Sequence, residues 1–170
     1  KYRIAELHLS DEILKPYFPL ESMFSALCHT AEQVFGISLV LDESVETWHE
    51  DIRYYWIRNR EDQCIAGLYV DLYTRKVKRG GAWMDICRSR RLTPEGVQLP
   101  VAFLNCNFPP PADGHPSLLT HHDVETLFHE FGHALHGLNS AVTYPSLSGT
   151  RVFRDYVEFP SQVNEHWLPT

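Results

Sequence analysis

A helix-like stretch over residues 120–138, THHDVETLFHEFGHALHGL, constrains this chain more than any other feature. It contains His129 and His133, four residues apart. A helix with about 3.6 residues per turn places two such side chains on one face, one turn apart. Two imidazoles in that arrangement can hold one metal ion, and Glu130 can take a proton from a water bound to it. The pattern therefore predicts half of a catalytic zinc site.

Local signals also predict the helix. Thr120, with Asp123 three residues later, forms a capping-box pattern at its start. Apolar residues recur at helical spacing, namely Val124, Leu127, Phe128, Phe131, Ala134, Leu135 and Leu138. Gly132 lowers helix propensity by about 1 kcal/mol relative to Ala, so we expect another segment to approach the backbone closely there. The alternative is a buried helix whose histidines only satisfy hydrogen bonds.

A catalytic zinc takes three protein ligands and leaves one position for water. The best candidate for the third ligand is Glu158, on a second helix expected over residues 154–168. Glu165 and Asp155 are its rivals. His136 follows on the same stripe as the two histidines but would close the open position, so we expect it to line the site.

Composition limits the partners of this 170-residue chain, which is long enough for one domain with a sizeable core. Its formal net charge is −7 and it has no basic cluster, which argues against nucleic acid or an anionic membrane as partner. No apolar run approaches the length of a membrane span. We expect a monomer.

The four cysteines are scattered and form no paired motif. They are Cys28, Cys64, Cys87 and Cys106, each in an apolar or strand-like setting. Buried free thiols in a reducing compartment are the favoured interpretation, over disulfides or a second metal site. We therefore expect a cytoplasmic protein.

The remaining segments predict a mixture of helix and strand. Their apolar spacing and turn residues indicate a helix over 19–35, strands over 37–41, 82–87 and 99–108, and a hairpin formed by 51–58 and 65–73. The expected fold is α+β, with a small, mostly antiparallel sheet packed against helices that include residues 120–138.

Several of these segments resemble one known family. They are HEFGHALHGL at 129–138, SGT at 148–150, VEFPSQ at 157–162, YVDLYTR at 69–75, GGAWM at 80–84 and NCNF at 105–108. Together they resemble the thimet oligopeptidase family of zinc metallopeptidases, family M3, over nearly all of the chain. FPSQ and the following NEHW look most similar to the bacterial peptidyl-dipeptidase, or dipeptidyl carboxypeptidase, branch.

The resemblance implies a zincin-like catalytic core with one Zn²⁺ per chain. Its ligands would be His129, His133 and Glu158, with Glu130 as general base and acid. The implied activity is hydrolysis of short peptides, with release of C-terminal dipeptides. The alternatives are an internally cleaving oligopeptidase and a non-catalytic zinc-binding fragment; product lengths and activity assays would separate them.

Neighbouring groups are expected to support the site. Metal-bound imidazoles usually donate their other N–H to a carboxylate or carbonyl, so Asp155, Gln162 and His136 are candidate partners. For Asp155 and Gln162, an ordinary position on the helix surface is an equally favoured alternative.

In zinc peptidases of this general shape, a strand beside the active helix offers its free edge to the substrate. We assign that role to the strand ending at residue 108, with Phe103, Leu104, Asn105 and the loop residue Gly149 in contact with peptide. An interior strand is the alternative.

The family's full chain is several times longer and largely helical. It carries, beyond the glutamate helix, a His and Tyr pair that stabilises the oxyanion. We therefore expect residues 1–170 to be a single catalytic-core domain, a fragment of a longer protein, and a poor enzyme alone, since losing one oxyanion donor costs about 10² to 10³ in rate.

Overall fold

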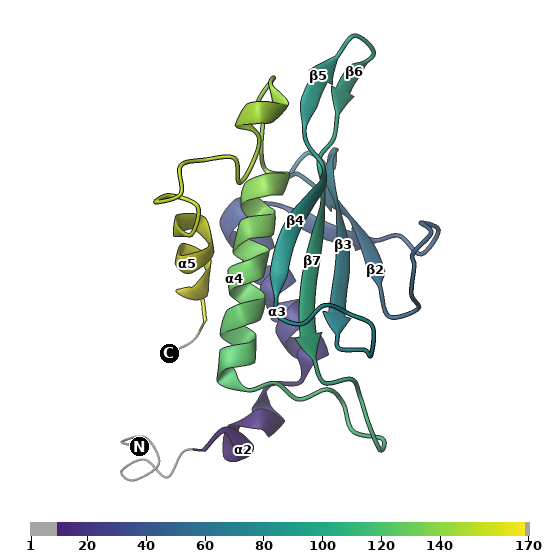
Figure 1. The fold of residues 1–170 in the computed structure, drawn as a ribbon, viewed down its shortest axis with the longest axis vertical. Coiled ribbons are helices and arrows are strands. Elements are labelled where there is room, and N and C mark those ends of the chain that lie inside the picture. The colour runs from purple at the N-terminus through teal and green to yellow at the C-terminus, as the bar shows by residue number, and fades with distance from the viewer. Residues whose placement is uncertain (1–9, 169–170) are drawn as a thin grey trace.

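Figure 1 shows the computed structural model of the chain, which describes residues 10–168. A sheet lies on one side of the molecule and helices on the other. The long helix α4 (His121–Leu138) packs against both the sheet and the short helix α5 (Phe159–Glu165). The expected α+β class is confirmed, and α4 is the element that joins the two sides.

The sheet has the strand order β1-β2-β3-β7-β4. Its strands are β1 (Ser38–Leu41), β2 (Arg53–Arg58), β3 (Cys64–Tyr73), β4 (Trp83–Arg88) and β7 (Val101–Phe108). Only β3 and β7 pair in parallel among these neighbours, so the predicted mostly antiparallel sheet and the β2–β3 hairpin are confirmed. A separate small hairpin, β5 (Arg91–Thr93) with β6 (Gly96–Gln98), was not expected.

The assignment of β7 as the edge strand was wrong. β7 pairs with β3 on one side and with β4 on the other, so both of its backbone edges are occupied. Nearly all of its residues are buried, as is typical of an interior strand that is covered on both faces. The edge strand next to β7 is β4, because the chain passes through β4 and the small hairpin before returning as β7 between β3 and β4; the other edge strand is β1.

The core lies between the sheet and two helices, α3 (Leu20–Phe35) and α4. Before α3 the chain forms α2 (Asp11–Leu14) and the short 3₁₀ helix η1 (Lys15–Tyr17). α3 starts directly after Pro19 and ends at Gly36, whose φ of 66° supplies the left-handed cap. The predicted capping box of α4 is present, since Thr120 and Asp123 bond each other reciprocally. These caps fix where both helices begin and end.

The opposite face of the sheet carries an aromatic cluster. Tyr69 lies between Tyr54 and Phe103, with ring centroids 4.7 and 5.5 Å away, and Trp48 packs on Tyr69 at 5.3 Å. Successive side chains of a strand point to opposite faces. Because Leu104 belongs to the helix-facing core, Phe103 points away from α4.

The second predicted helix is shorter than expected. α5 covers only Phe159–Glu165, and the residues just before it form turns. Pro160 occupies the first turn, where its missing N–H costs nothing, so the helix cannot start much earlier. Glu158 is consequently the N-cap residue of α5 and does not lie within the helix.

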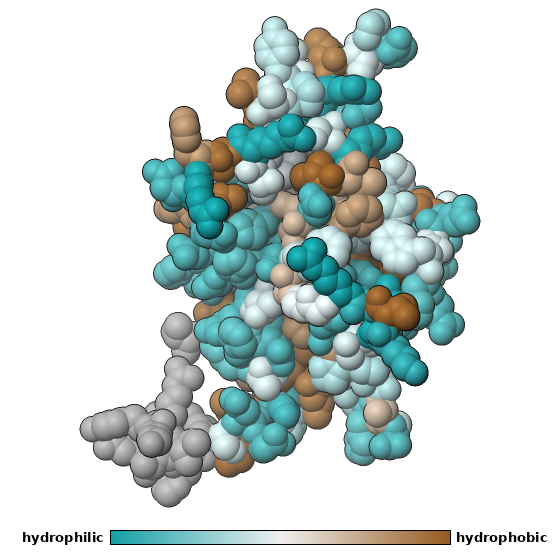
Figure 2. All heavy atoms as spheres, viewed as in Figure 1, coloured by the Kyte–Doolittle hydropathy of each residue, from teal (hydrophilic) through white to brown (hydrophobic). Residues whose placement is uncertain are grey.

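Hydrophobic side chains are exposed over the segment between α4 and α5, which includes the 3₁₀ helix η2 (Pro145–Leu147). Figure 2 shows several of them as brown spheres at the upper left. Leu147 is 62% exposed and Phe153 is 88% exposed. Within residues 10–168, no helix combines the length and the apolar character needed to cross a membrane.

The cysteine prediction is partly wrong. All four thiols are free, but only Cys106 is buried. Cys28 is half-buried, and Cys64 and Cys87 are exposed because each lies near an end of a strand. An apolar sequence setting therefore did not imply burial at the ends of β3 and β4.

Candidate metal centre

The structure brings the three predicted ligands to one place. His129 and His133 leave α4 on the same face, and the turn before α5 carries Glu158 to them. Glu158 Oε2 lies 3.2 Å from His129 Nε2 and 2.9 Å from His133 Nε2. One ligand atom from each residue lies within 4.8 Å of the others.

This arrangement fits a zinc ion. Nitrogen and oxygen atoms held about 2.0–2.1 Å from a tetrahedral zinc lie about 3.3 Å from one another. The two distances from Glu158 Oε2 to the imidazole nitrogens, 3.2 and 2.9 Å, are close to that value. Three protein ligands also leave the fourth position open, as in catalytic sites. The role of each residue as a ligand stays a prediction.

Glu165 holds the first histidine, a role that sequence reasoning missed. Its Oε1 lies 2.6 Å from Nδ1 of His129. A carboxylate can only accept, so Nδ1 donates the hydrogen and Nε2 is left with a lone pair that faces Glu158. From the sequence alone, Glu165 is only a rival ligand. Its position about two helical turns after Glu158 could have suggested this contact.

The second histidine has a different environment. His133 is only 13% exposed, and burial lowers the pKa of its imidazole, which favours the neutral form that binds metal. Its Nδ1 is buried and has no hydrogen-bond partner among residues 10–168. The two imidazoles are therefore held unequally.

Two of the expected partners lie elsewhere. Asp155 and Gln162 are exposed, and neither side chain bonds to a histidine in the described chain. The expectation assumed one continuous helix from residue 154. Because α5 begins only at Phe159, Asp155 lies in a turn, and Gln162 is on the outer side of the helix.

Glu130 faces the edge of the sheet. The side chain is half-buried, and burial raises the pKa of its carboxyl; the nearby charge of Glu158 acts in the same direction. The imidazole of His129 and a hydrogen bond from the backbone of Met84 partly oppose this shift. Met84 belongs to β4, so the Glu130 carboxylate lies beside this strand as well as near His129 and Glu158.

The residues predicted to touch substrate are not arranged to do so. Phe103 and Asn105 point to the face of the sheet away from α4, and Leu104 is fully buried in the core. Gly149 is buried against Gly137, and its N–H already donates to a serine hydroxyl. The predictions for Phe103, Leu104 and Asn105 followed from treating β7 as the edge.

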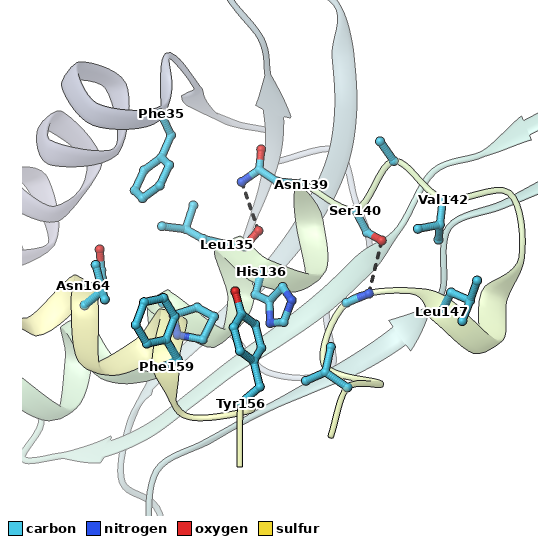
Figure 3. Close-up of a pocket in the computed structure, with 16 residues that line it drawn as sticks. Phe35, Leu135, His136, Asn139, Ser140, Val142, Leu147, Tyr156, Phe159 and Asn164 are labelled. Carbon is cyan, nitrogen blue, oxygen red and sulfur yellow. Dashed lines mark hydrogen bonds between the residues drawn. The ribbon is translucent and has the colours of Figure 1, made fainter. Parts of the chain in front are cut away.

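Two cavities adjoin the site. One of about 450 Å³ lies beside α4, between the end of α3 and α5, and Figure 3 shows Phe35, Leu135, His136 and Tyr156 around it. His136 is thus a lining residue, and burial lowers the pKa of its imidazole. A smaller cleft of about 230 Å³ is lined by His129, Glu130 and Glu165.

Comparisons with known proteins agree with this geometry. The chain is 42% identical over 161 residues to oligopeptidase A of Haemophilus influenzae, covering 94% of this chain and 24% of that protein. It is 44% identical over 160 residues to dipeptidyl carboxypeptidase of Salmonella typhimurium, covering 94% of this chain and 23% of the relative. An Arabidopsis thaliana organellar oligopeptidase A is 40% identical over 174 residues, covering 98% of this chain and 22% of its own length.

The relatives include both oligopeptidases and a dipeptidyl carboxypeptidase. The identities to the oligopeptidase A and the dipeptidyl carboxypeptidase are nearly equal, so the comparison does not favour the peptidyl-dipeptidase branch expected from the sequence. The chain spans about a quarter of the length of each relative. The pattern that describes peptidase family M3 matches residues 1–170. With its histidine pair and glutamate brought together as zinc chemistry requires, the chain belongs to the zinc metallopeptidase family M3.

Proposed function

We propose that this protein hydrolyses peptide bonds in short peptides by means of a zinc-activated water. The observation that carries the proposal is the position of Glu130, beside the edge strand β4 as well as near the His-His-Glu cluster. A base in that position lies near both a metal and a strand edge where an extended peptide can bind.

The chemistry follows from the side chains. Zinc, when bound by His129, His133 and Glu158, lowers the pKa of a water ligand towards 7 and polarises a carbonyl group. Glu130 accepts the proton of the attacking water and later gives it to the departing amine. Its raised pKa, caused first by burial, suits a group that must both accept and release a proton. Glu165 keeps His129 in the tautomer whose Nε2 binds metal.

The substrate is proposed to bind along β4. The outer edge of this strand has no strand partner within residues 10–168, and its backbone approaches Glu130 at Met84. The N–H of Ile86 is bonded to the Asp85 side chain at 2.7 Å, so a peptide would have to displace that contact. Backbone pairing of this kind accepts many side chains, which suits a general peptidase.

The mode of cleavage is proposed to be release of C-terminal dipeptides. The rival is internal cleavage, and the comparisons do not decide between the two modes, because the identities to an oligopeptidase A and to a dipeptidyl carboxypeptidase are nearly equal. A defined peptide of eight or so residues, with and without a C-terminal amide, separates the two. Dipeptide products that require the free carboxylate support the first mode, and internal fragments from both peptides support the second.

Peptide hydrolysis by wild type and by Glu130→Gln tests the proposal. The variant keeps the size of the side chain and leaves the predicted ligands intact, but it cannot accept the proton. We expect it to bind zinc as wild type does and to cleave about 10² to 10⁴ times more slowly. A variant with undiminished activity would contradict the proposed role of Glu130.

We further propose that residues 1–170 act as one domain of a longer, mostly helical protein that is monomeric and cytoplasmic. The free thiols are compatible with a reducing compartment, and the M3 relatives are about four times longer than this chain. Cell fractionation and sedimentation of the complete protein would test both statements.

A further inference from the structure

α5 meets α4 through polar rather than apolar side chains. The buried residues of α5 are Ser161 and Asn164, which are 0% and 3% exposed. Its apolar residues Phe159 and Val163 are instead 56% and 42% exposed. A helix held by hydrophobic burial presents the opposite pattern. Apolar burial therefore does not account for the position of α5.

Gly132 lets the two helices come close together. A Cβ atom at this position would lie 2.6 Å from Cα of Ser161 and 3.1 Å from the carbonyl oxygen of Pro160. Both neighbours are backbone atoms, which cannot turn aside as a flexible side chain can. The close approach predicted for Gly132 from the sequence is thus made by the first turn of α5.

One hydrogen bond joins α5 to α4 at this distance, and a second, within the first turn of α5, orients Glu158. Asn164 Nδ2 donates to the carbonyl oxygen of Phe128 at 2.6 Å, directly before the first histidine. The hydroxyl of Ser161 has one hydrogen, and the acceptors within reach are the carbonyl oxygen of Glu158 at 2.8 Å and Glu158 Oε2 at 3.3 Å. Ser161 thus bonds to the residue that carries the predicted third ligand.

We propose that Gly132, Ser161 and Asn164 form a spacing clamp. It sets the distance between α5 and α4, and through it the position of Glu158 relative to the two histidines. The three are positioning residues for the metal site, and this inference rests on the zinc site proposed above. None of them supplies a ligand atom.

A methyl group at residue 132 would displace α5 by more than metal–ligand distances tolerate. Ordinary contacts of a Cβ atom begin at 3.4 Å, so a methyl group at residue 132 would push α5 away by about 0.8 Å. Metal–ligand distances tolerate only about 0.2 Å of change. A shift of that size takes Glu158 out of coordination range unless the turn before α5 deforms.

The chain offers matched control positions. Asn139 Nδ2 donates to the carbonyl oxygen of Leu135 at 3.0 Å, and Ser140 Oγ accepts from the N–H of Gly149 at 3.2 Å. Figure 3 shows both bonds as dashed lines beyond the last turn of α4. Like the clamp contacts, they join an asparagine amide to a backbone carbonyl and a serine hydroxyl to the backbone, but the Ser140 hydroxyl accepts where that of Ser161 donates, and neither involves α5.

The experiment measures zinc affinity by competition with a coloured chelator, at a temperature where circular dichroism shows every variant to be folded. Gly132→Ala, Ser161→Ala and Asn164→Ala are compared with Asn139→Ala and Ser140→Ala. We expect each clamp variant to bind zinc about 10 to 100 times more weakly than wild type. The control variants should bind it as wild type does.

A second set of variants distinguishes an effect on the position of Glu158 from a general loss of structure. In a chain that already carries Glu158→Ala, Gly132→Ala should cause no further loss of zinc affinity, because the clamp acts through that carboxylate. Equal losses in both backgrounds would overturn the clamp, as would clamp variants with wild-type affinity. A wild-type chain that binds no zinc would instead overturn the zinc site, and the clamp with it.

Discussion

His129 and His133 differ in how their second ring nitrogens are held. His129 Nδ1 is bonded to Glu165, whereas His133 Nδ1 is buried without a partner in the described chain. A carboxylate behind a metal-bound imidazole fixes its tautomer and raises its basicity. Glu165 should therefore contribute to metal affinity even though it is not a ligand.

Replacing Glu165 tests that contribution. We expect Glu165→Ala to weaken zinc binding about 10 to 100-fold, because His129 loses the acceptor that orients it. Glu125→Ala is the control, since within residues 10–168 that carboxylate forms its ion pairs with His121 and His122 at the start of α4. Competition with a chelator gives both affinities. Equal binding by the Glu165 variant and wild type would contradict the assigned role.

A second residue-scale prediction concerns a buried ion pair remote from the site. Asp71 and Lys78 are 8% and 5% exposed and lie 2.8 Å apart, and Arg75 also contacts Asp71. Burial by itself would raise the pKa of Asp71, but the bonds from Arg75 and Lys78 outweigh it and lower the pKa. Asp71→Asn leaves Lys78 buried beside backbone carbonyl oxygens but without its charged partner, so we expect a loss of about 3–5 kcal/mol in unfolding free energy.

Denaturant unfolding at several pH values checks this prediction. A lowered folded-state pKa gives stability that is present above the unfolded value, near pH 4, and lost as pH falls through the folded value. Wild type should therefore lose this contribution in acid, while the variant lacks it throughout. Glu12→Gln, which breaks an exposed pair with Lys15, should leave stability unchanged. A similar stability for both variants would contradict the account.

At the scale of elements, local signals predicted most of the fold. α4 could be predicted because its capping box and apolar spacing agree, and the β2–β3 hairpin because polar residues separate two apolar strands. The position of β7 could not be predicted from local pattern, because strand order depends on where the chain returns to the sheet. The start of α5 was misjudged by treating residues before Pro160 as helix, which displaced Asp155 from its expected role.

The free edge of β4 leads to a prediction at this scale. Only alternate amides of an extended peptide point towards a neighbouring strand. We expect N-methylation of the amides that pair with β4 to weaken the binding of a short peptide inhibitor about 2- to 13-fold each, since one hydrogen bond contributes about 0.5–1.5 kcal/mol. Methylation at the intervening amides is the control. Equal inhibition constants for peptides methylated at the pairing amides and at the intervening amides would contradict binding along β4.

At the scale of the whole molecule, the chain carries the predicted metal site but only about a quarter of the length of its relatives. Exposed apolar residues such as Phe153 and Leu147 lie near α5, and the aromatic face of the sheet includes Trp48 at 57% exposure. Metal binding is therefore a more direct test of these 170 residues than catalytic rate.

The measurement that tests the central claim is zinc content per chain in wild type, Glu130→Gln and Glu158→Ala, each purified without added metal. We predict about one zinc in wild type and in Glu130→Gln, and its loss in Glu158→Ala, because we propose Glu158 as a ligand and place Glu130 outside the ligand set. Zinc retained in Glu158→Ala, or absent from wild type, would contradict a His-His-Glu site between α4 and α5.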